Sequence, residues 1–128
     1  MDGVATQAGM ATGGIILAAD VSAFATASGA TDLSGINDLV VYLKAQSLFT
    51  SSRMFPMKSA QNAGSGSTLY GLGGLTSSNF TLVASPTWGA GGIAFNGSSQ
   101  YATLPDCLTA NDRYFMARIT PTSATLSS

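Results

Sequence analysis

Residues 86–104 read Pro-Thr-Trp-Gly-Ala-Gly-Gly-Ile-Ala-Phe-Asn-Gly-Ser-Ser-Gln-Tyr-Ala-Thr-Leu, and they form the most specific stretch of the chain. Ile93–Phe95 is a short β-favourable run that ends at Asn96-Gly97, a dipeptide typical of tight hairpin turns. Residues 100–104 then alternate their side chains between two faces, as a strand does. The stretch therefore predicts short antiparallel strands separated by glycine-rich turns.

Further strands are expected on both sides of this stretch. Phe80–Val83 is β-favourable and stops at Ser85-Pro86, and Arg113–Thr120 alternates between two faces. Several short strands about ten residues apart, separated by Gly, Pro and Asn, are typical of a sandwich or barrel. We therefore expect an all-β protein with an antiparallel β-sandwich region over residues 36–128.

Residues 36–52 admit two interpretations. Ile36 and Val40 lie at helical spacing, and Asn37-Asp38 could cap a helix. Leu39–Leu43, however, is enriched in β-branched and aromatic residues, which favours a strand. We expect the strand, because periodicity alone cannot assign so short an apolar run.

Residues 1–35 form a separate compositional unit dominated by Ala, Gly, Thr and Ser. We expect an extended N-terminal arm, with residues 25–35 as a flexible linker. The arm carries five large apolar side chains: Ile15, Ile16, Leu17, Val21 and Phe24. Each would forgo roughly 1.5–3 kcal/mol of burial if left in water, so we expect them to attach the chain to a larger particle. The alternatives are an unattached tail and an arm that folds back over an open edge of its own sandwich.

Small residues and scarce charge dominate the composition. Gly, Ala, Ser and Thr make up about half of the 128 residues, charged residues are 9%, and the net charge is −1. The length suits a single domain. This composition is typical of a surface-exposed β protein or a shell component rather than a cytosolic enzyme.

The residue types exclude many kinds of site. The chain has no histidine and no glutamate, which excludes histidine-containing triads and histidine-bound zinc. The single Cys107 cannot form an internal disulfide. Asp106 and Asp112 flank a loop and match no motif for paired catalytic carboxylates. We therefore expect no catalytic residues, no metal and no cofactor.

Nucleic acid and membrane are not expected as partners. The five cations are scattered and form no basic stripe: Lys44, Arg53, Lys58, Arg113 and Arg118. The longest apolar stretch, Ile15–Ala19, is far shorter than the ~20 residues of a spanning helix. Met1-Asp2-Gly3 has an acid where a signal peptide has Lys or Arg, so we expect a chain made in a host cytoplasm without a signal peptide.

Residues 86–104 resemble the hallmark strand pair of laminin-G-like, concanavalin A-like jelly-roll domains. Residues 39–45 resemble the opening strand of that family, and residues 113–123 resemble the strand that follows the pair. The resemblance covers about residues 39–123 and implies an incomplete jelly-roll, since only part of the family's strands is present. Jelly-roll proteins with such a small-residue lead are similar to bacteriophage tail fibres, head fibres and receptor-binding appendages.

The resemblance implies a non-enzymatic structural component of a phage virion, an appendage attached through residues 1–35. Its expected partners are other virion proteins, further copies of the chain (a trimer) and a host-surface glycan. The alternative is a free carbohydrate-binding, lectin-like module in which Tyr70, Trp88 and Tyr101 would contact the sugar, although each is also a candidate core residue. Catalytic family members carry an acidic pair that includes glutamate, which this chain lacks, so no glucanase activity is implied.

Overall fold

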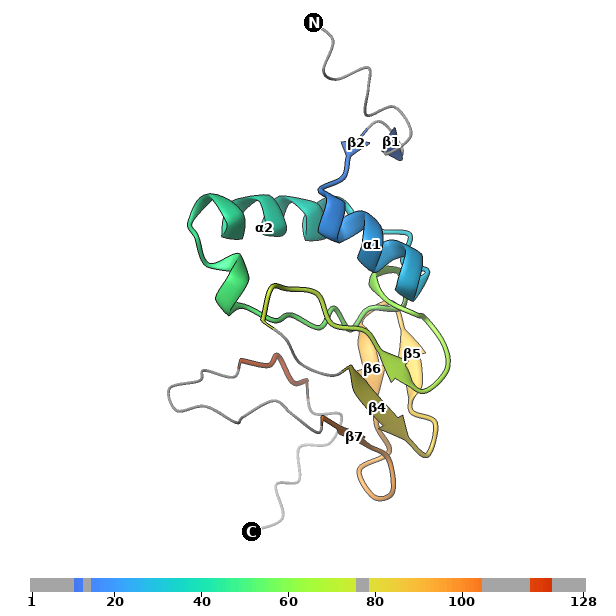
Figure 1. Cartoon of the computed structure of the whole chain (residues 1–128). Helices are drawn as coiled ribbons and strands as arrows, with labels where there is room; N and C mark the ends of the chain where they lie inside the picture. Colours follow the sequence, from blue (N-terminus) through green and yellow to red (C-terminus); the bar gives the residue numbers. More distant parts are fainter. Residues whose placement is uncertain (1–10, 13–14, 76–78, 105–115, 121–128) are drawn as a thin grey trace, which may run out of the picture.

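The structure, a computed structural model, describes residues 11–12, 15–75, 79–104 and 116–120. Along these residues two α-helices come early and short strands follow them (Figure 1). The strands belong to three separate small sheets. Both helices lie on the same side of the irregular segments that follow them (Figure 1).

The first helix, α1, spans Ala19–Ser28. Alanine is the strongest helix former, and alanines occupy four of its ten positions. The helix ends at Gly29, which has a left-handed backbone (φ 79°) and donates its N–H to the carbonyl oxygen of Ala25 at 2.8 Å. A glycine in this conformation is a common helix C-cap, because it has no Cβ to clash.

The prediction of an extended arm over residues 1–35 is therefore wrong for the part that the structure describes. α1 replaces it, and residues 25–28, assigned to the linker, belong to this helix. Leu17, Val21 and Phe24 lie three and four residues apart, so they face the same side and are all buried. Before α1, the short strands β1 (Ala11–Thr12) and β2 (Ile15–Ile16) pair antiparallel.

The second helix, α2, spans Ser34–Ala45, so the strand predicted over Leu39–Leu43 is wrong. Ile36 and Val40 are buried and Leu43 is partly buried against the core, which is the helical spacing that the competing interpretation used. The core thus accepts every third or fourth side chain of this segment. Packing against it overrides the local β preference.

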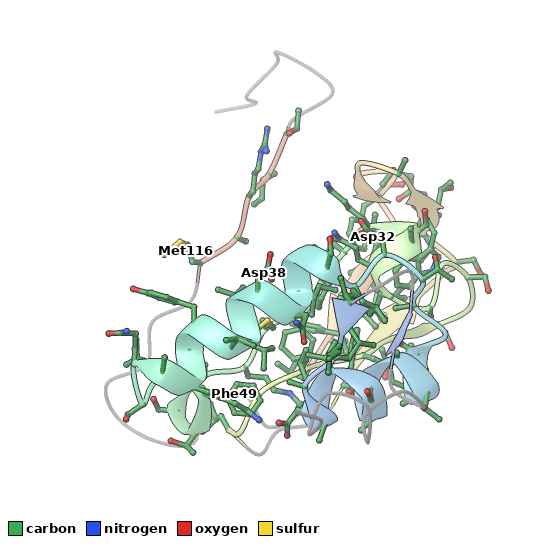
Figure 2. All side chains as sticks on the ribbon, turned by 90° about the horizontal axis from the view of Figure 1, so that it is seen from above. Asp32, Asp38, Phe49 and Met116 are labelled. Atoms are coloured by element: carbon green, nitrogen blue, oxygen red, sulfur yellow. The ribbon has the colours of Figure 1, made fainter. Side chains whose placement is uncertain are left out.

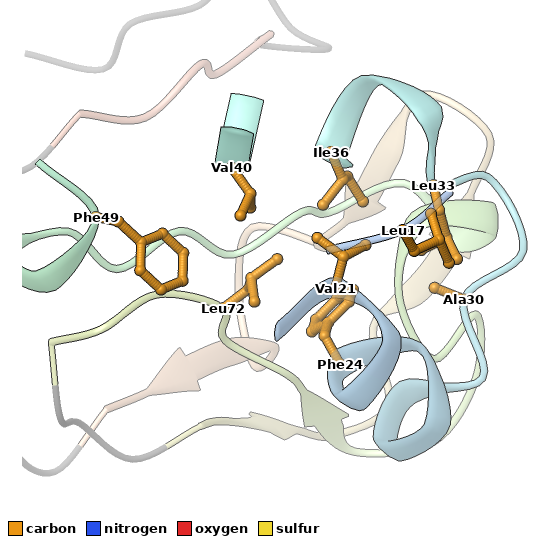
Figure 3. Packing of buried hydrophobic residues seen from close by; sticks show 9 residues of the cluster. All are labelled: Leu17, Val21, Phe24, Ala30, Leu33, Ile36, Val40, Phe49 and Leu72. Atoms are coloured by element: carbon orange, nitrogen blue, oxygen red, sulfur yellow. The ribbon is translucent and has the colours of Figure 1, made fainter. Parts of the chain in front are cut away.

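One hydrophobic core lies between the helices and residues 49–72 (Figure 3). The helices and their connection supply most of it, and Phe49 and Leu72 close it from the other side. Its buried members are Leu17, Val21, Phe24, Ala30, Leu33, Ile36, Val40, Phe49 and Leu72. Val21 and Val40 are fully buried, so this core is where the two helices are fixed relative to each other.

Asn37 connects the helices by hydrogen bonds as well. Its Oδ1 accepts the N–H of Ala18 at 2.8 Å, and its Nδ2 donates to the carbonyl oxygen of Ile16 at 3.4 Å. The side chain of one helix therefore satisfies a backbone N–H immediately before the other, where helical partners are missing.

Glycines allow residues 49–53 and 71–74 to approach each other closely. Met54 and Leu72 form an isolated antiparallel bridge with two N–H···O bonds of 2.8 Å. A Cβ on Gly73, whose φ is 148°, would lie 2.1 Å from the carbonyl oxygen of Ser52. The short 3-10 helix η2 (Phe49–Ser51) occupies the same region. A side chain at Gly73 would therefore separate the two segments.

Asn62 stabilises the loop between the 3-10 helix η3 (Ser59–Gln61) and the strand that begins at Thr68. Its side chain is 1% exposed, and Nδ2 donates to the carbonyl oxygens of Pro56 and Tyr70, both at 2.9 Å. Oδ1 accepts the N–H groups of Ala63 at 2.9 Å and Tyr70 at 3.0 Å. All four hydrogen-bonding positions of the amide are used, so one side chain replaces the backbone ladder that this irregular segment lacks.

The strands form two small sheets after residue 67. β3 (Thr68–Leu69), β4 (Phe80–Val83) and β7 (Tyr101–Thr103) make an antiparallel sheet in the order β3-β4-β7. β5 (Thr87–Gly89) and β6 (Gly92–Ala94) form a separate hairpin in which Trp88 lies opposite Ile93. Strands were predicted at 80–83, 93–95 and 100–104, and these are confirmed within one or two residues.

The jelly-roll sandwich is nevertheless wrong as the fold class. The sheets have only three and two strands of two to four residues each, next to two helices, and no jelly-roll is formed by the described residues. Strands this short bury little: in β4–β7 only Leu82 is buried. The region that the sequence assigned to an arm supplies the core instead.

The last predicted strand, Arg113–Thr120, is described only in part. Residues 116–120 belong to no strand, and Met116 is 96% exposed. Its other residues, together with Asp106, Cys107 and Asp112, lie outside the described residues.

Candidate functional site

The five residues expected to attach the chain to a particle lie mostly inside the molecule. Leu17, Val21 and Phe24 are buried in the core, and Ile15 packs against it. Ile16 is the exposed member of the group. The burial that the sequence required of a partner is thus supplied by this chain itself, through α2 and residues 49–72.

The three aromatic residues expected to contact a sugar lie in three different environments. Tyr70 is half-buried and packs against the core. Trp88, on β5, donates its Nε1–H to the carbonyl oxygen of Gly66 at 3.1 Å. Tyr101 is exposed on β7, opposite Val83 of β4. The structure therefore gathers no aromatic platform from this set, and Tyr70 lines a hollow beside α1.

The outward half of α2 carries several large, exposed apolar side chains. These are Leu39, Val41 and Tyr42, followed by Leu48 just beyond the helix, and we call these four residues the α2 outer face. They are 45%, 52%, 59% and 49% exposed, respectively. Figure 2 shows α2 from above, with Asp38 labelled on it. α2 thus exposes large apolar side chains in addition to those that it buries in the core, which is unusual for a helix at a protein surface.

Lys44, in the last turn of α2, contacts both α1 and Phe49. Its Nζ forms an ion pair with Asp20 of α1 and lies 4.9 Å from the centre of the Phe49 ring. Both charged side chains are about two-fifths exposed, so the ion pair contributes at most about 1 kcal/mol. It adds to the core packing that already fixes the helices.

A hollow of about 360 Å³ lies between α1 and residues 70–73, and we call it the Arg53 hollow. From α1 it is lined by Asp20, Ala23, Phe24 and Ala27. The other lining residues are Arg53, Tyr70, Gly71, Leu72, Gly73 and Asn79. It therefore combines a cation, an anion, an amide and an aromatic ring with small side chains that leave space.

Arg53 is the residue in this hollow with unmet hydrogen-bonding capacity. Its Nη2 donates to Oδ1 of Asn79 at 3.4 Å, a long bond, while its buried Nε has no partner. Its guanidinium also lies over the Phe55 ring, 5.8 Å from the centre. Burial lowers the pKa of Arg53 from its ordinary value, because desolvation disfavours the charged form.

Sequence reasoning missed this hollow. In the sequence Arg53 is one of five scattered cations, and no motif connects it with Asn79. Gly71 was the available signal: a Cβ there would lie 2.4 Å from Nε of Arg53, so the glycine makes room for the guanidinium. The sequence spacing of Arg53, Gly71 and Asn79 does not predict that they lie close together.

The described residues hold no group of three or more His, Cys, Asp or Glu side chains that could bind a metal ion. Among the same residues, neither helix has the length and apolar character needed to cross a membrane.

A scan against protein-family models, a search of curated proteins and a search of solved structures each found no match to this chain.

Proposed function

We propose that this chain is a non-enzymatic structural component of a phage virion, a building unit of a tail or head appendage that associates with further copies of itself. The composition, rich in small residues and poor in charge, supports the class of protein. The observation that carries the proposal is the α2 outer face. A protein that works by assembly needs an exposed apolar surface, because burying that surface against a partner lowers the free energy.

The α2 outer face is the part of the described surface best suited to burial against a partner. Leu39, Val41 and Tyr42 lie within one turn of α2 and are spread around the exposed half of the helix, whose other half is already in the core. Fully burying such side chains contributes roughly 1.5–3 kcal/mol each. A second helix laid over Tyr42, between Leu39 and Val41, would bury this ring and contact its apolar neighbours.

A second copy of the same chain is the partner that the charges favour. α2 carries Asp38 in its first half and Lys44 in its last turn. Two α2 helices packed antiparallel about a twofold axis would bring the Asp38 of each towards the Lys44 end of the other, and their dipoles would oppose favourably. The net charge of −1 gives little repulsion between copies. A twofold contact thus takes the place of the trimer in our proposal.

We propose that the residues before α1 contact other virion proteins. The β1–β2 pair includes Ile16, the exposed member of the predicted attachment residues. We therefore place attachment there, separately from the α2 contact.

Self-association is tested by sedimentation of the whole chain and of Val41→Glu. Glutamate is a better helix former than valine and residue 41 is exposed, so the variant should fold. We expect the parent chain to sediment as a dimer or larger assembly and Val41→Glu as a folded monomer. Ser65→Glu adds the same charge at an exposed loop and should behave like the parent chain. A monomeric parent chain at micromolar concentration would exclude the α2 contact.

Assignment to the virion needs a separate measurement, because many proteins self-associate. Mass spectrometry of purified particles should detect the chain in a fixed ratio to the other particle proteins. Its absence from particles would end this part of the proposal.

The alternative of a free carbohydrate-binding module retains one supporting observation, the presence of Tyr70 in the Arg53 hollow. Trp88 and Tyr101 are not among the residues that line it.

A further inference from the structure

We infer that the Arg53 hollow is a binding site for a sugar that carries a carboxylate, such as a uronic acid. The inference does not depend on the α2 contact, since the hollow lies between α1 and residues 70–73, and none of the four residues of the α2 outer face lines it.

Arg53 has hydrogen-bond donors that this chain leaves without good partners. A guanidinium has five N–H donors and no acceptor, and partial burial removes water from it. Among the described residues, Lys44 and Asp20 form the sole ion pair, so Arg53 has no acidic partner there. Asn79 offers one neutral acceptor at 3.4 Å, shared with the N–H of Gly71 at 2.9 Å. A carboxylate is the group that matches the remaining donors best, because it accepts two parallel N–H bonds from a guanidinium.

The negative charge of Asp20 limits the charge that a ligand in the hollow can carry. Asp20 also lines the hollow, and its charge is only partly compensated by its exposed bond to Lys44. A doubly charged phosphate would be repelled by Asp20 more strongly than a singly charged carboxylate. The balance therefore favours a ligand with one negative charge.

The other residues that line the hollow suit the ring and hydroxyl groups of a sugar. Tyr70 offers an aromatic surface for the apolar side of a sugar ring, while Asp20 and Asn79 provide oxygen and amide groups for hydroxyls. Ala23 and Ala27 are exposed and small, so α1 leaves the hollow open on its side. A volume of about 360 Å³ lies within the range of small-molecule sites and suits one or two sugar rings.

The test is a titration of the isotope-labelled chain with glucuronate, followed by amide NMR, with glucose, acetate and inorganic phosphate as comparison ligands. We expect saturable shifts at Ala27 and Gly71 with glucuronate. Glucose should cause no saturable shift, because it lacks the carboxylate, and acetate and phosphate should bind more weakly than glucuronate. Failure of glucuronate to bind at tens of millimolar, or tighter binding of any comparison ligand, would overturn the inference.

Three variants locate the site. Arg53→Gln should weaken glucuronate binding about tenfold or more, the effect of losing a charged hydrogen-bond pair. Ala27→Leu should weaken it by filling the hollow from an exposed helix position, where the substitution is tolerated by the fold. Lys58→Gln removes an exposed cation elsewhere and should leave binding unchanged. Equal losses in Arg53→Gln and Lys58→Gln would show a non-specific charge effect, and full binding by Ala27→Leu would place the ligand elsewhere; either result contradicts the site.

Discussion

Residues 15–75 and residues 80–104 are held together in different ways. The first region contains the two helices and all nine buried residues of the core cluster. The second contains only short strands, and its large side chains Phe95 and Tyr101 are exposed. Side-chain hydrogen bonds to the backbone connect its turns instead: Oδ1 of Asn96 accepts the N–H groups of Ser98, Ser99 and Gln100 at 3.0–3.1 Å. Apolar burial thus stabilises one region, and local polar contacts stabilise the other.

The largest expected effect comes from removing an aromatic ring in each region. Phe24→Ala deletes a buried ring and should lower the free energy of unfolding by about 3–5 kcal/mol. Phe95→Ala, at a residue that is 41% exposed, should cost less than about 1 kcal/mol. Urea unfolding followed by circular dichroism measures both.

If Phe24→Ala does not fold, Phe24→Leu keeps most of the volume and should lower the free energy of unfolding by about 1–1.5 kcal/mol. Equal losses in the alanine variants at 24 and 95 would contradict the proposed difference between the two regions.

Asn62→Ala should have the next largest effect, although it changes a polar residue. It leaves the N–H and carbonyl of Tyr70 and the carbonyl of Pro56 without their partner in a buried place. We expect a loss of about 2–3 kcal/mol in the free energy of unfolding. Gln61→Ala, which removes a surface bond to Asp32, serves as the control and should cost less than about 1 kcal/mol. A neutral Asn62→Ala would show that water replaces the amide.

Gln100→Ala tests the polar contacts of the second region. Its Nε2 donates to the carbonyl oxygens of Ala84 and Ser85 at 3.0 Å, and both residues have positive φ angles, 60° and 53°. Its Oε1 accepts the N–H of Asn96 at 2.8 Å. We expect a loss of about 1 kcal/mol and faster hydrogen exchange at Asn96, with no change at α1 amides. Gln46→Ala is the matched control, and uniform acceleration over the whole chain would mean that the two regions unfold together.

The smallest expected effect is at the ion pair of the helical region. Asp20→Asn should lower the free energy of unfolding by no more than about 1 kcal/mol, and the difference should shrink as salt is added. A double-mutant cycle with Lys44→Gln isolates the pair. A coupling that persists at high salt would show that the pair is more enclosed than its exposure indicates.

Sequence reasoning succeeded where local signals decide the structure. The strands at 80–83 and 101–103 follow from β-favourable residues next to turn signals. It failed where packing decides. Residues 25–35 looked like a linker because alanine, serine and glycine are frequent in linkers and in alanine-rich helices alike. Leu39–Leu43 has strand composition, and only the location of the core shows that Val40 must point inward as part of a helix.

The Arg53 hollow could not be predicted for a related reason. Asp20, Arg53 and Asn79 are more than 25 residues apart in sequence at each step, and they meet only because α1 packs against residues 70–73. No local pattern records such a meeting. The α2 outer face was hidden by the same strand prediction, since a strand would have placed Val41 and Tyr42 on opposite sides.

The position of Leu72 has a consequence for how the chain is synthesised. Both helices are complete in sequence by residue 45, but Leu72 and the glycines beside it close the core from the other side. A nascent chain that has emerged only to residue 60 would therefore lack the cover that Leu72 gives the core, and the apolar surface left open could aggregate or bind chaperones. Ribosomes stalled before and after the codons for residues 71–74 should carry chains that differ sharply in protease sensitivity over α1 and α2.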